Sequence, residues 1–360
     1  MLLVGGTPVA LAVWILTISE SGHSFAVDFV NSFWPAGHHV LHGQSPFPPV
    51  THAALARGTA FVYPAPAALL VAPFALLPVT VAAALFTAFL AASALLALYA
   101  VGVRDWRCYS TIFLWWPVLA ALQTANLTLL LTLGAALVWR YRDRRAVGYA
   151  AGAVLAFKLF LWPLVIWLFA TRRYAAGLRA LAVAVVLTFA SWAALGFAGL
   201  TDYLPALRLL TRLEEQASYT PLAIGVRLGL DLSSARALGL VISAAALGGL
   251  IWLARKRRDD ERSFVLALAA GVLLSPVVWI HYFALFIVAL GLLRPHYGRL
   301  WLVPFVAFGP IRPSGPTWWA IPVLAIFAAL LTIALARSPE ERRARSIAPR
   351  LAGAPGCSPT

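Results

Sequence analysis

The stretch VTVAAALFTAFLAASALLALYAVGV, residues 79–103, decides the fold of this chain. It contains no charged residue and is followed directly by Arg104. A helix needs about 20 apolar residues to cross the hydrocarbon core of a bilayer. The stretch therefore predicts a transmembrane helix. Comparable stretches predict further spans near residues 2–19, 180–200, 237–254 and 319–336.

The composition agrees with a membrane protein. Of the 360 residues, 62% are hydrophobic and only 11% are charged, and the mean hydropathy is +0.85. A soluble domain has about 25% charged residues, and a disordered chain has low hydrophobicity, so both classes are excluded. We expect an all-α polytopic membrane protein, a bundle of about 11 to 13 helices that includes short ones.

The net charge of +15 follows the positive-inside rule. If both termini are cytoplasmic, the inner segments hold 21 of the 28 lysines and arginines. The acidic residues divide almost equally between the two sides, which leaves a net charge of +14 inside and +1 outside. The positive charge thus reports topology, and binding of nucleic acid is not needed to explain it.

Three apolar stretches are too long for one crossing and contain a polar or proline-containing break, which predicts hairpins of short helices. They cover residues 108–139 with a break at Gln123-Thr124-Ala125-Asn126, residues 146–170 with a break at Lys158, and residues 263–293 with a break at Ser275-Pro276. A further helix is expected over residues 300–311.

No boundary between soluble domains is visible, so residues 1–336 are expected to form one transmembrane domain. Two hydrophilic segments, residues 20–60 and 201–236, face outward in this topology. Residues 337–360 are rich in Arg, Pro and Ala and predict a disordered cytoplasmic tail.

The first outward segment contains an acid and most of the histidines. On helical spacing, one face carries Asp28, Asn31, His38 and His42, and the opposite face carries Phe29, Phe33, Ala36 and Val40. Pro35 is expected to split the segment into two short helices along the membrane surface. A solvated interfacial helix without a catalytic role explains this spacing equally well. The histidines match no standard zinc pattern, so no metal site is predicted.

Lys158 is the most conspicuous single residue. It lies between the apolar runs AVGYAAGAVLAF and LFLWPLVIWLFA, with no acidic residue nearby in the sequence. An ionisable side chain in this setting indicates a functional site, and its natural partner would be an anion such as a lipid phosphate. The alternative is a lysine that reaches the interface from a helix tip.

Two other segments contribute polar residues on the outer side. Trp279 and His281 follow the third break, where a tryptophan is a common interface anchor. Arg208 and Arg212, in the second outward segment, either bind phosphate or pair with nearby acids. Fingerprints of nucleotide-binding proteins and of hydrolases are absent from the sequence.

Several short motifs occur in a fixed order along the chain. They are Asp28 soon after the first span, Gly43-Gln44-Ser45-Pro46-Phe47, Tyr63-Pro64-Ala65-Pro66, Gln123-Thr124-Ala125-Asn126, Lys158-Leu159-Phe160, Gln216 with Ser218, and the run from Ser275 to His281. Each motif alone is weak. Together they resemble the polyprenol-phosphate-sugar-dependent glycosyltransferases of family 87, which belong to the GT-C superfamily.

This resemblance implies a GT-C-type bundle. It also implies transfer of a sugar, often mannose, from a polyprenyl phosphate donor to a glycolipid or glycan acceptor. The reaction would take place at the outer face of the cytoplasmic membrane and invert the anomeric centre. The expected partners are the donor, the acceptor and membrane lipids.

The resemblance also assigns roles to residues. Asp28 is expected to accept the proton of the acceptor hydroxyl. Lys158, with Arg208 and Arg212, is expected to bind the donor phosphate. The residues expected to contact substrate are Tyr63, Gln123, Asn126, Gln216, Ser218, Trp279 and His281. Neither a cofactor nor an obligatory metal is expected, because a single phosphate demands a metal less than a diphosphate does.

Two other functions are possible for such a chain. A transporter or flippase for lipid-linked sugars usually has ionisable residues at mid-membrane and inverted repeats, and neither is visible. A glycan ligase or polymerase would have a large late outer loop, whereas the segment after His281 offers only residues 312–317.

Overall fold

The computed structural model describes residues 25–47, 50–307 and 325–329, with isolated residues at 6, 9–10, 12–13, 17, 332 and 336. The predicted spans at 2–19 and 319–336 lie largely outside the described residues, and the predicted tail lies outside them entirely. Within the described residues every regular element is a helix, so the predicted all-α fold is confirmed.

Among the residues that the structure describes, three helices are long and apolar enough to cross a membrane. They are α5 (Val79–Val101), α11 (Tyr174–Ala194) and α14 (Leu232–Trp252), which continues into the π-helix η5 (Leu253–Arg257). Many of their large apolar side chains are exposed, including Leu96, Phe189 and Val241. Many exposed apolar side chains along helices of this length are stable against lipid rather than water. The chain is a polytopic membrane protein.

The boundaries of α11 differ from the predicted span at 180–200. The helix begins at Tyr174 and includes Arg179, which the prediction excluded because of its charge. Near a helix end this charge is tolerated, since the guanidinium donates to the carbonyl of Arg145 at 3.0 Å. The helix ends at Ala194 because Gly196 and Gly199 follow in left-handed conformations.

The three broken hairpins form where the sequence predicts them. The first consists of α6 (Trp106–Thr111), η3 (Ile112–Leu114), α7 (Trp116–Thr124) and α8 (Thr128–Arg140). The second consists of α9 (Ala146–Phe157), η4 (Leu159–Leu161) and α10 (Pro163–Ala170). The third consists of α15 (Asp260–Leu273), η6 (Ile280–Leu285) and α16 (Phe286–Leu293). A 3-10 helix, η7 (Arg299–Ala307), covers the described part of the further helix predicted at 300–311.

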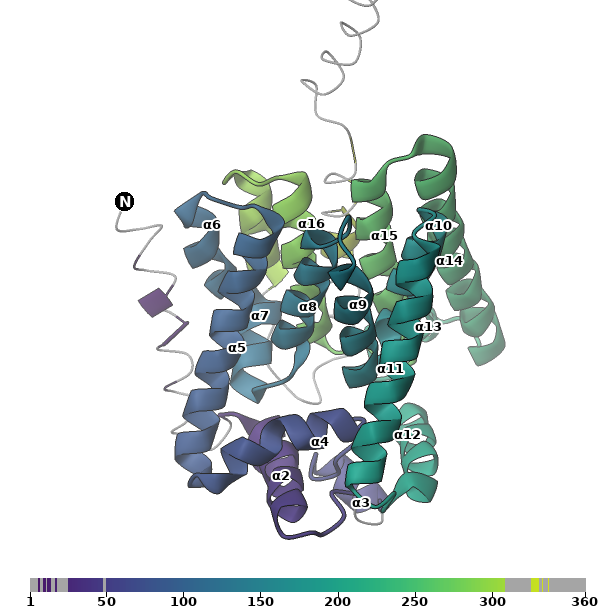
Figure 1. Ribbon diagram of the computed structural model, residues 1–360. Helices are drawn as coiled ribbons and strands as arrows, with labels where there is room; N and C mark the ends of the chain where they lie inside the picture. Colours follow the sequence, from purple (N-terminus) through teal and green to yellow (C-terminus); the bar gives the residue numbers. More distant parts are fainter. Residues whose placement is uncertain are drawn as a thin grey trace, which may run out of the picture.

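Short helices lie across one end of this bundle (Figure 1). We call this set of helices the polar layer. It comprises the π-helix η1 (Phe29–Phe33), α2 (Trp34–Leu41), α3 (His52–Ala56), α4 (Ala65–Val71), the 3-10 helix η2 (Ala72–Leu76) and α12 (Leu200–Glu214). After α12, α13 (Pro221–Arg227) packs on α14.

The two faces predicted for the first part of the layer are present, because Phe29 and Phe33 are buried whereas Asn31 and His42 are exposed. The two short helices expected around Pro35 are present, η1 and α2, but no gap separates them. The chain passes directly from η1 into α2, with Pro35 in the first turn of α2. A proline in a first turn leaves no hydrogen bond of the new helix unmade.

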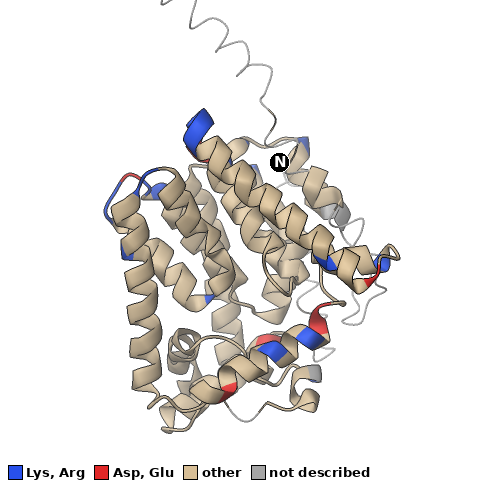
Figure 2. Cartoon of the chain, turned by 90° about the vertical axis from the view of Figure 1, so that its right-hand side faces the viewer, with Lys and Arg blue, Asp and Glu red and all other residues tan. Residues whose placement is uncertain are grey.

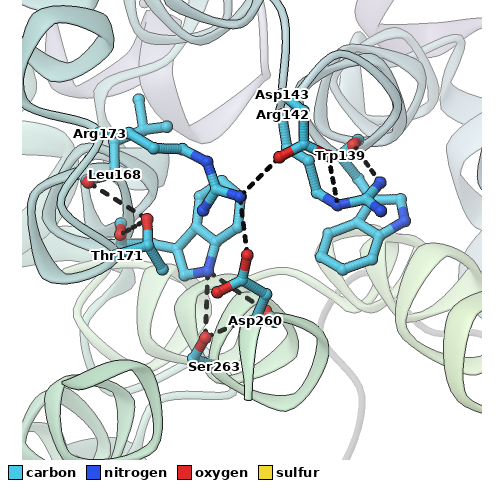
Figure 3. A network of polar contacts seen from close by, with 9 residues as sticks. Trp139, Arg142, Asp143, Leu168, Thr171, Arg173, Asp260 and Ser263 are labelled. Atoms are coloured by element: carbon cyan, nitrogen blue, oxygen red, sulfur yellow. Dashed lines mark hydrogen bonds and ion pairs between the residues drawn. The ribbon is translucent and has the colours of Figure 1, made fainter. Parts of the chain in front are cut away.

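Basic residues gather at the opposite end of the bundle (Figure 2). There Arg173, just before α11, donates to Asp143 in the α8–α9 turn at 2.9 Å and to Asp260 at the start of α15 at 2.7 Å (Figure 3). The indole of Trp167 donates to the hydroxyl of Ser263 at 3.1 Å. This network ties three helix connections together at the end remote from the polar layer.

Candidate active site

Asp28 lies at the junction between the polar layer and the bundle. Two residues before it, the N–H of Ala26 donates to the carbonyl of Gln123 at 2.6 Å, which fastens this turn to the end of α7. Directly after it, the buried ring of Phe29 stacks on Phe86 of α5, with the centroids 4.7 Å apart. These contacts hold the half-buried carboxylate of Asp28 against the break between α7 and α8.

Asn126, in that break, bonds to Asp28. Its side-chain amide nitrogen donates to Asp28 Oδ2 at 2.7 Å and to the hydroxyl oxygen of Tyr63 at 2.7 Å. Its Oδ1 accepts from the backbone N–H of Thr128 at 3.2 Å and from the Thr128 hydroxyl at 2.9 Å. Asn126 is only 1% exposed.

Tyr63 connects Asn126 to Lys158. Its ring is buried before α4 and packs on Phe33 with the centroids 4.6 Å apart. Its hydroxyl oxygen also accepts from Lys158 Nζ at 3.2 Å. A hydrogen-bonded chain thus runs from Asp28 through Asn126 and Tyr63 to Lys158, and we call it the Asp28–Lys158 chain.

Lys158 lies between α9 and η4, where an extended backbone conformation ends α9. Its ammonium lies 4.3 Å from the ring centroid of Tyr282 and 4.6 Å from that of Tyr63. Trp279 and Phe160 lie at 5.9 and 6.0 Å. Of the three ammonium hydrogens, one is used by the bond to Tyr63.

His281 lies beside these rings, at the start of η6. Its imidazole stacks on Trp279 with the centroids 5.9 Å apart and is 5.1 Å from Tyr282. The residue is 6% exposed, and its Nε2 has no hydrogen-bond partner among the described residues. An unpartnered polar atom in a buried position is costly, and Nε2 is an unsatisfied polar atom of this kind beside the rings that surround Lys158.

The electrostatics of Asp28 reflect its partners. Burial raises the pKa of its carboxyl, while the hydrogen bond from Asn126 and the charge of Lys158 lower it. The pKa of Tyr63 is raised well above its ordinary value by burial and by the neighbouring Tyr282 and Asp28, so the hydroxyl stays protonated. The site therefore offers a carboxylate of increased basicity near a cation.

Other predicted site residues lie apart from the Asp28–Lys158 chain. Arg208 and Arg212 are exposed on α12, on the same open face of the helix as Leu204, Leu207 and Thr211. Gln216 is exposed, and its carbonyl accepts from Arg227 at 2.9 Å. In the described part of the chain, no hydrogen bond or ion pair joins these residues to Asp28 or Lys158.

Two further predicted site residues, Gln123 and Ser218, form hydrogen bonds away from the Asp28–Lys158 chain. Gln123 contributes its carbonyl to Ala26, and its side chain is half-buried. Ser218 is buried, and its hydroxyl bonds to the carbonyl of Glu215 at 3.0 Å and to the hydroxyl of Thr220 at 3.1 Å.

Thr128 and Tyr282 were not among the predicted site residues. The Asn126-x-Thr128 spacing is a local signal for Thr128, because asparagine side chains often bond to the backbone two residues on. Nothing in the sequence brings Tyr282 to Lys158. Among the described residues, no three His, Cys, Asp or Glu side chains cluster as metal ligands would.

The fold and the site together define a polytopic membrane protein with a carboxylate and a lysine at one end of its helix bundle. Residues 61–279 match the sequence profile of glycosyltransferase family 87, more than half of the chain. The chain belongs to this family and is a membrane glycosyltransferase. Searches of curated proteins and of solved structures returned no match.

Proposed function

We propose that this glycosyltransferase moves a sugar, mannose in the first instance, from a polyprenyl phosphate donor to a glycolipid or glycan acceptor, with inversion. Family membership supports the reaction class. The Asp28–Lys158 chain supports the finer proposal, because it joins a carboxylate and an ammonium in one site. Transfer from a lipid phosphate needs a base for the acceptor and a cation for the leaving group.

Asp28 is the proposed catalytic base. An acceptor hydroxyl attacks the anomeric carbon, and its proton passes to the Asp28 carboxylate. Asn126 occupies Oδ2, so Oδ1 is the oxygen left for that proton. As the new glycosidic bond forms, the bond from the anomeric carbon to the phosphate oxygen breaks, and its electron pair remains on the phosphate.

Lys158 is the proposed partner of that phosphate. The leaving group gains negative charge as it becomes a phosphomonoester, and a fixed ammonium stabilises this charge most in the transition state. The surrounding rings hold the ammonium without consuming its hydrogens. His281 Nε2 is a further proposed contact to a substrate oxygen, and the Trp279 ring a proposed apolar contact.

The remaining predicted residues have less direct roles in this proposal. We assign the reacting phosphate to Lys158 rather than to Arg208 and Arg212, because only Lys158 is joined by hydrogen bonds to the residues around Asp28. The two arginines would meet the donor phosphate before it reaches Lys158. Gln123, Gln216 and Ser218 remain proposed substrate contacts.

The proposed orientation rests on charge. The basic end of the bundle is assigned to the cytoplasm, as are both termini. The polar layer with Asp28 then faces outward, in the cytoplasmic membrane. A reaction at that face fits a lipid-linked donor, which can be presented there without a soluble nucleotide sugar.

The test compares purified wild-type protein with Asp28→Asn in nanodiscs, using labelled polyprenyl phosphate mannose and cell-envelope glycolipids. A general base contributes about 10²–10⁴-fold, so Asp28→Asn is expected to lose about 10³-fold in kcat while its donor Kd is unchanged. The control is Asp202→Asn, an exposed acid on α12, which is expected to behave as wild type.

Three outcomes would contradict the proposal. Wild-type turnover by Asp28→Asn would remove Asp28 as the base. Transfer directly from a nucleotide sugar would overturn the donor class. Movement of the labelled lipid across the bilayer without sugar transfer would favour a transporter.

A further inference from the structure

Thr128, the first residue of α8, determines the direction of the hydrogen bonds at the site. Its backbone N–H and its hydroxyl both donate hydrogen bonds to Asn126 Oδ1, at 3.2 and 2.9 Å. A backbone N–H can only donate, so the Asn126 atom that faces it must be the carbonyl oxygen. The two ends of an amide are otherwise hard to tell apart. Here the chemistry of the neighbour distinguishes them.

The NH₂ group of Asn126 must then face the opposite way, toward Asp28 and Tyr63, at 2.7 Å each. Both of its hydrogens and both acceptor positions of its oxygen are occupied by protein atoms. The side chain is 1% exposed and has no bonding capacity left for a substrate. A reversed amide would place its oxygen against the carboxylate of Asp28 and repel it.

We propose that Thr128 and Asn126 are positioning residues for the base. Thr128 fixes the amide of Asn126, and Asn126 holds Asp28 Oδ2 so that an ionised Oδ1 is presented to the acceptor hydroxyl. Neither residue touches substrate. The inference rests on the proposed function of Asp28 and extends it to a second layer of residues.

The groups that face Asp28 determine how its pKa should change in variants of Thr128 and Asn126. Lys158, Tyr63 and Tyr282 interact with its charge, and His281 lies beside Lys158. The Asn126 hydrogen bond lowers the pKa of Asp28. If that bond is lost or weakened, one of the two effects that offset burial is reduced, and the pKa of Asp28 rises. The base acts only when ionised, so kcat/KM falls at low pH as Asp28 becomes protonated. We call this fall the acid limb of the pH profile, and it moves to higher pH when the pKa of Asp28 rises.

The experiment measures pH profiles of kcat/KM for three full-length threonine variants in nanodiscs. Thr128→Val removes the hydroxyl at constant size, and Thr128→Ser retains it. The matched control is Thr132→Val, one turn along α8, whose buried hydroxyl donates to the carbonyl of Thr128 at 2.8 Å instead of to Asn126. Asn126→Asp, which keeps the size but replaces the NH₂ donor by an oxygen, is measured in parallel.

Thr128→Val keeps the backbone N–H bond to Asn126 Oδ1 and loses the shorter hydroxyl bond. The amide keeps its direction but is held less firmly, so the acid limb is expected to move up by about half a pH unit. Thr128→Val should lower kcat roughly tenfold, as loss of a supporting hydrogen bond does elsewhere. Its KM values should change by less than about twofold, because ground-state binding is untouched. Asn126→Asp is expected to shift the limb further, while Thr128→Ser and Thr132→Val should match wild type.

A Thr128→Val or Asn126→Asp profile that overlays wild type would overturn the inference. So would an equal shift in Thr132→Val, because that would indicate a general effect of α8. Asp28→Asn in the same assay separates the two hypotheses. If it is active, the proposed base is wrong. If it is inactive while Thr128→Val overlays wild type, only the positioning role fails.

Discussion

Lys158 illustrates how a cation is kept available among apolar helices. Each ring close to its ammonium contributes about 0.5–2 kcal/mol of cation–π attraction. In the described part of the chain no ion pair joins it to Asp28, because Asn126 and Tyr63 lie between them in the Asp28–Lys158 chain. The two charges therefore do not neutralise each other by direct contact.

A prediction at the residue scale follows for Lys158→Ala. Loss of the ammonium should raise KM for the donor and lower kcat/KM by about 10²–10³-fold, as removal of one charge-stabilising group does in other sites. KM for the acceptor should change little. Steady-state kinetics with each substrate varied in turn give the answer.

The chain offers one matched control, since Lys256 is its only other lysine and is exposed on η5. Lys256→Ala is expected to leave all constants unchanged. An equal loss of donor and acceptor affinity in Lys158→Ala would count against a phosphate role.

The sequence singled out the residues that the structure brings together at this site, Asp28, Tyr63, Asn126, Lys158, Trp279 and His281. Their catalytic and binding roles remain predictions. Lys158 and the breaks that contain Asn126 and precede Trp279 and His281 stood out because they interrupt apolar sequence, whereas the roles expected for Asp28 and Tyr63 came from the resemblance to family 87. Thr128 and Tyr282 did not stand out from their neighbours in the sequence. Their part in the site depends on tertiary contacts between segments far apart in the sequence.

At the scale of elements, the packing of α9 on α11 supports the position of Lys158. Gly148 and Gly152, one turn apart on α9, lie against the backbone of α11. A Cβ at Gly152 would lie 2.6 Å from the carbonyl oxygen of Ala180, and one at Gly148 would lie 2.9 Å from that of Ala176. Small residues let membrane helices approach this closely. Because α9 ends beside Lys158, this contact fixes where the ammonium lies.

Gly152→Ala is therefore expected to destabilise the protein. The new methyl group meets a backbone oxygen that cannot move without α11, and overpacking of this kind costs about 1–3 kcal/mol. A lower Tm in detergent and a lower kcat, through displacement of Lys158, are the expected readouts.

The control for this variant is Gly248→Ala on α14, where a Cβ would meet nothing within 4 Å. Alanine is the better helix former, so its Tm should equal or exceed that of wild type. A Gly152→Ala variant with wild-type Tm and turnover would be incompatible with the close packing of α9 on α11.

Element boundaries were less predictable than element existence. Apolar length and polar breaks sufficed to place α5 and the three hairpins. The π-helix η1 and the early start of α11 depend on backbone geometry and on a hydrogen bond from Arg179, which hydropathy does not register.

At the scale of the whole molecule, charge and chemistry occupy opposite ends. The basic turns gather at one end (Figure 2), whereas the polar layer lies across the other end of the bundle (Figure 1). Asp28 directly precedes η1 of that layer. The positive-inside rule acts on Lys and Arg in short connections, and it is the basis on which we propose that the basic end is cytoplasmic. The proposed outward site thus rests on residues that take no part in catalysis.

Cysteine labelling of intact cells tests this orientation directly. With Cys108 and Cys357 replaced by alanine, single cysteines are placed at two exposed positions, Gln44→Cys beside α2 and Arg144→Cys in the α8–α9 turn. Gln44 is a better position than Gly43, whose φ of +68° strains any other residue. A membrane-impermeant maleimide should label Gln44→Cys in intact cells and Arg144→Cys only after permeabilisation. The reverse pattern would place Asp28 on the cytoplasmic side, where nucleotide sugars are available. The topology would then no longer support a lipid-linked donor.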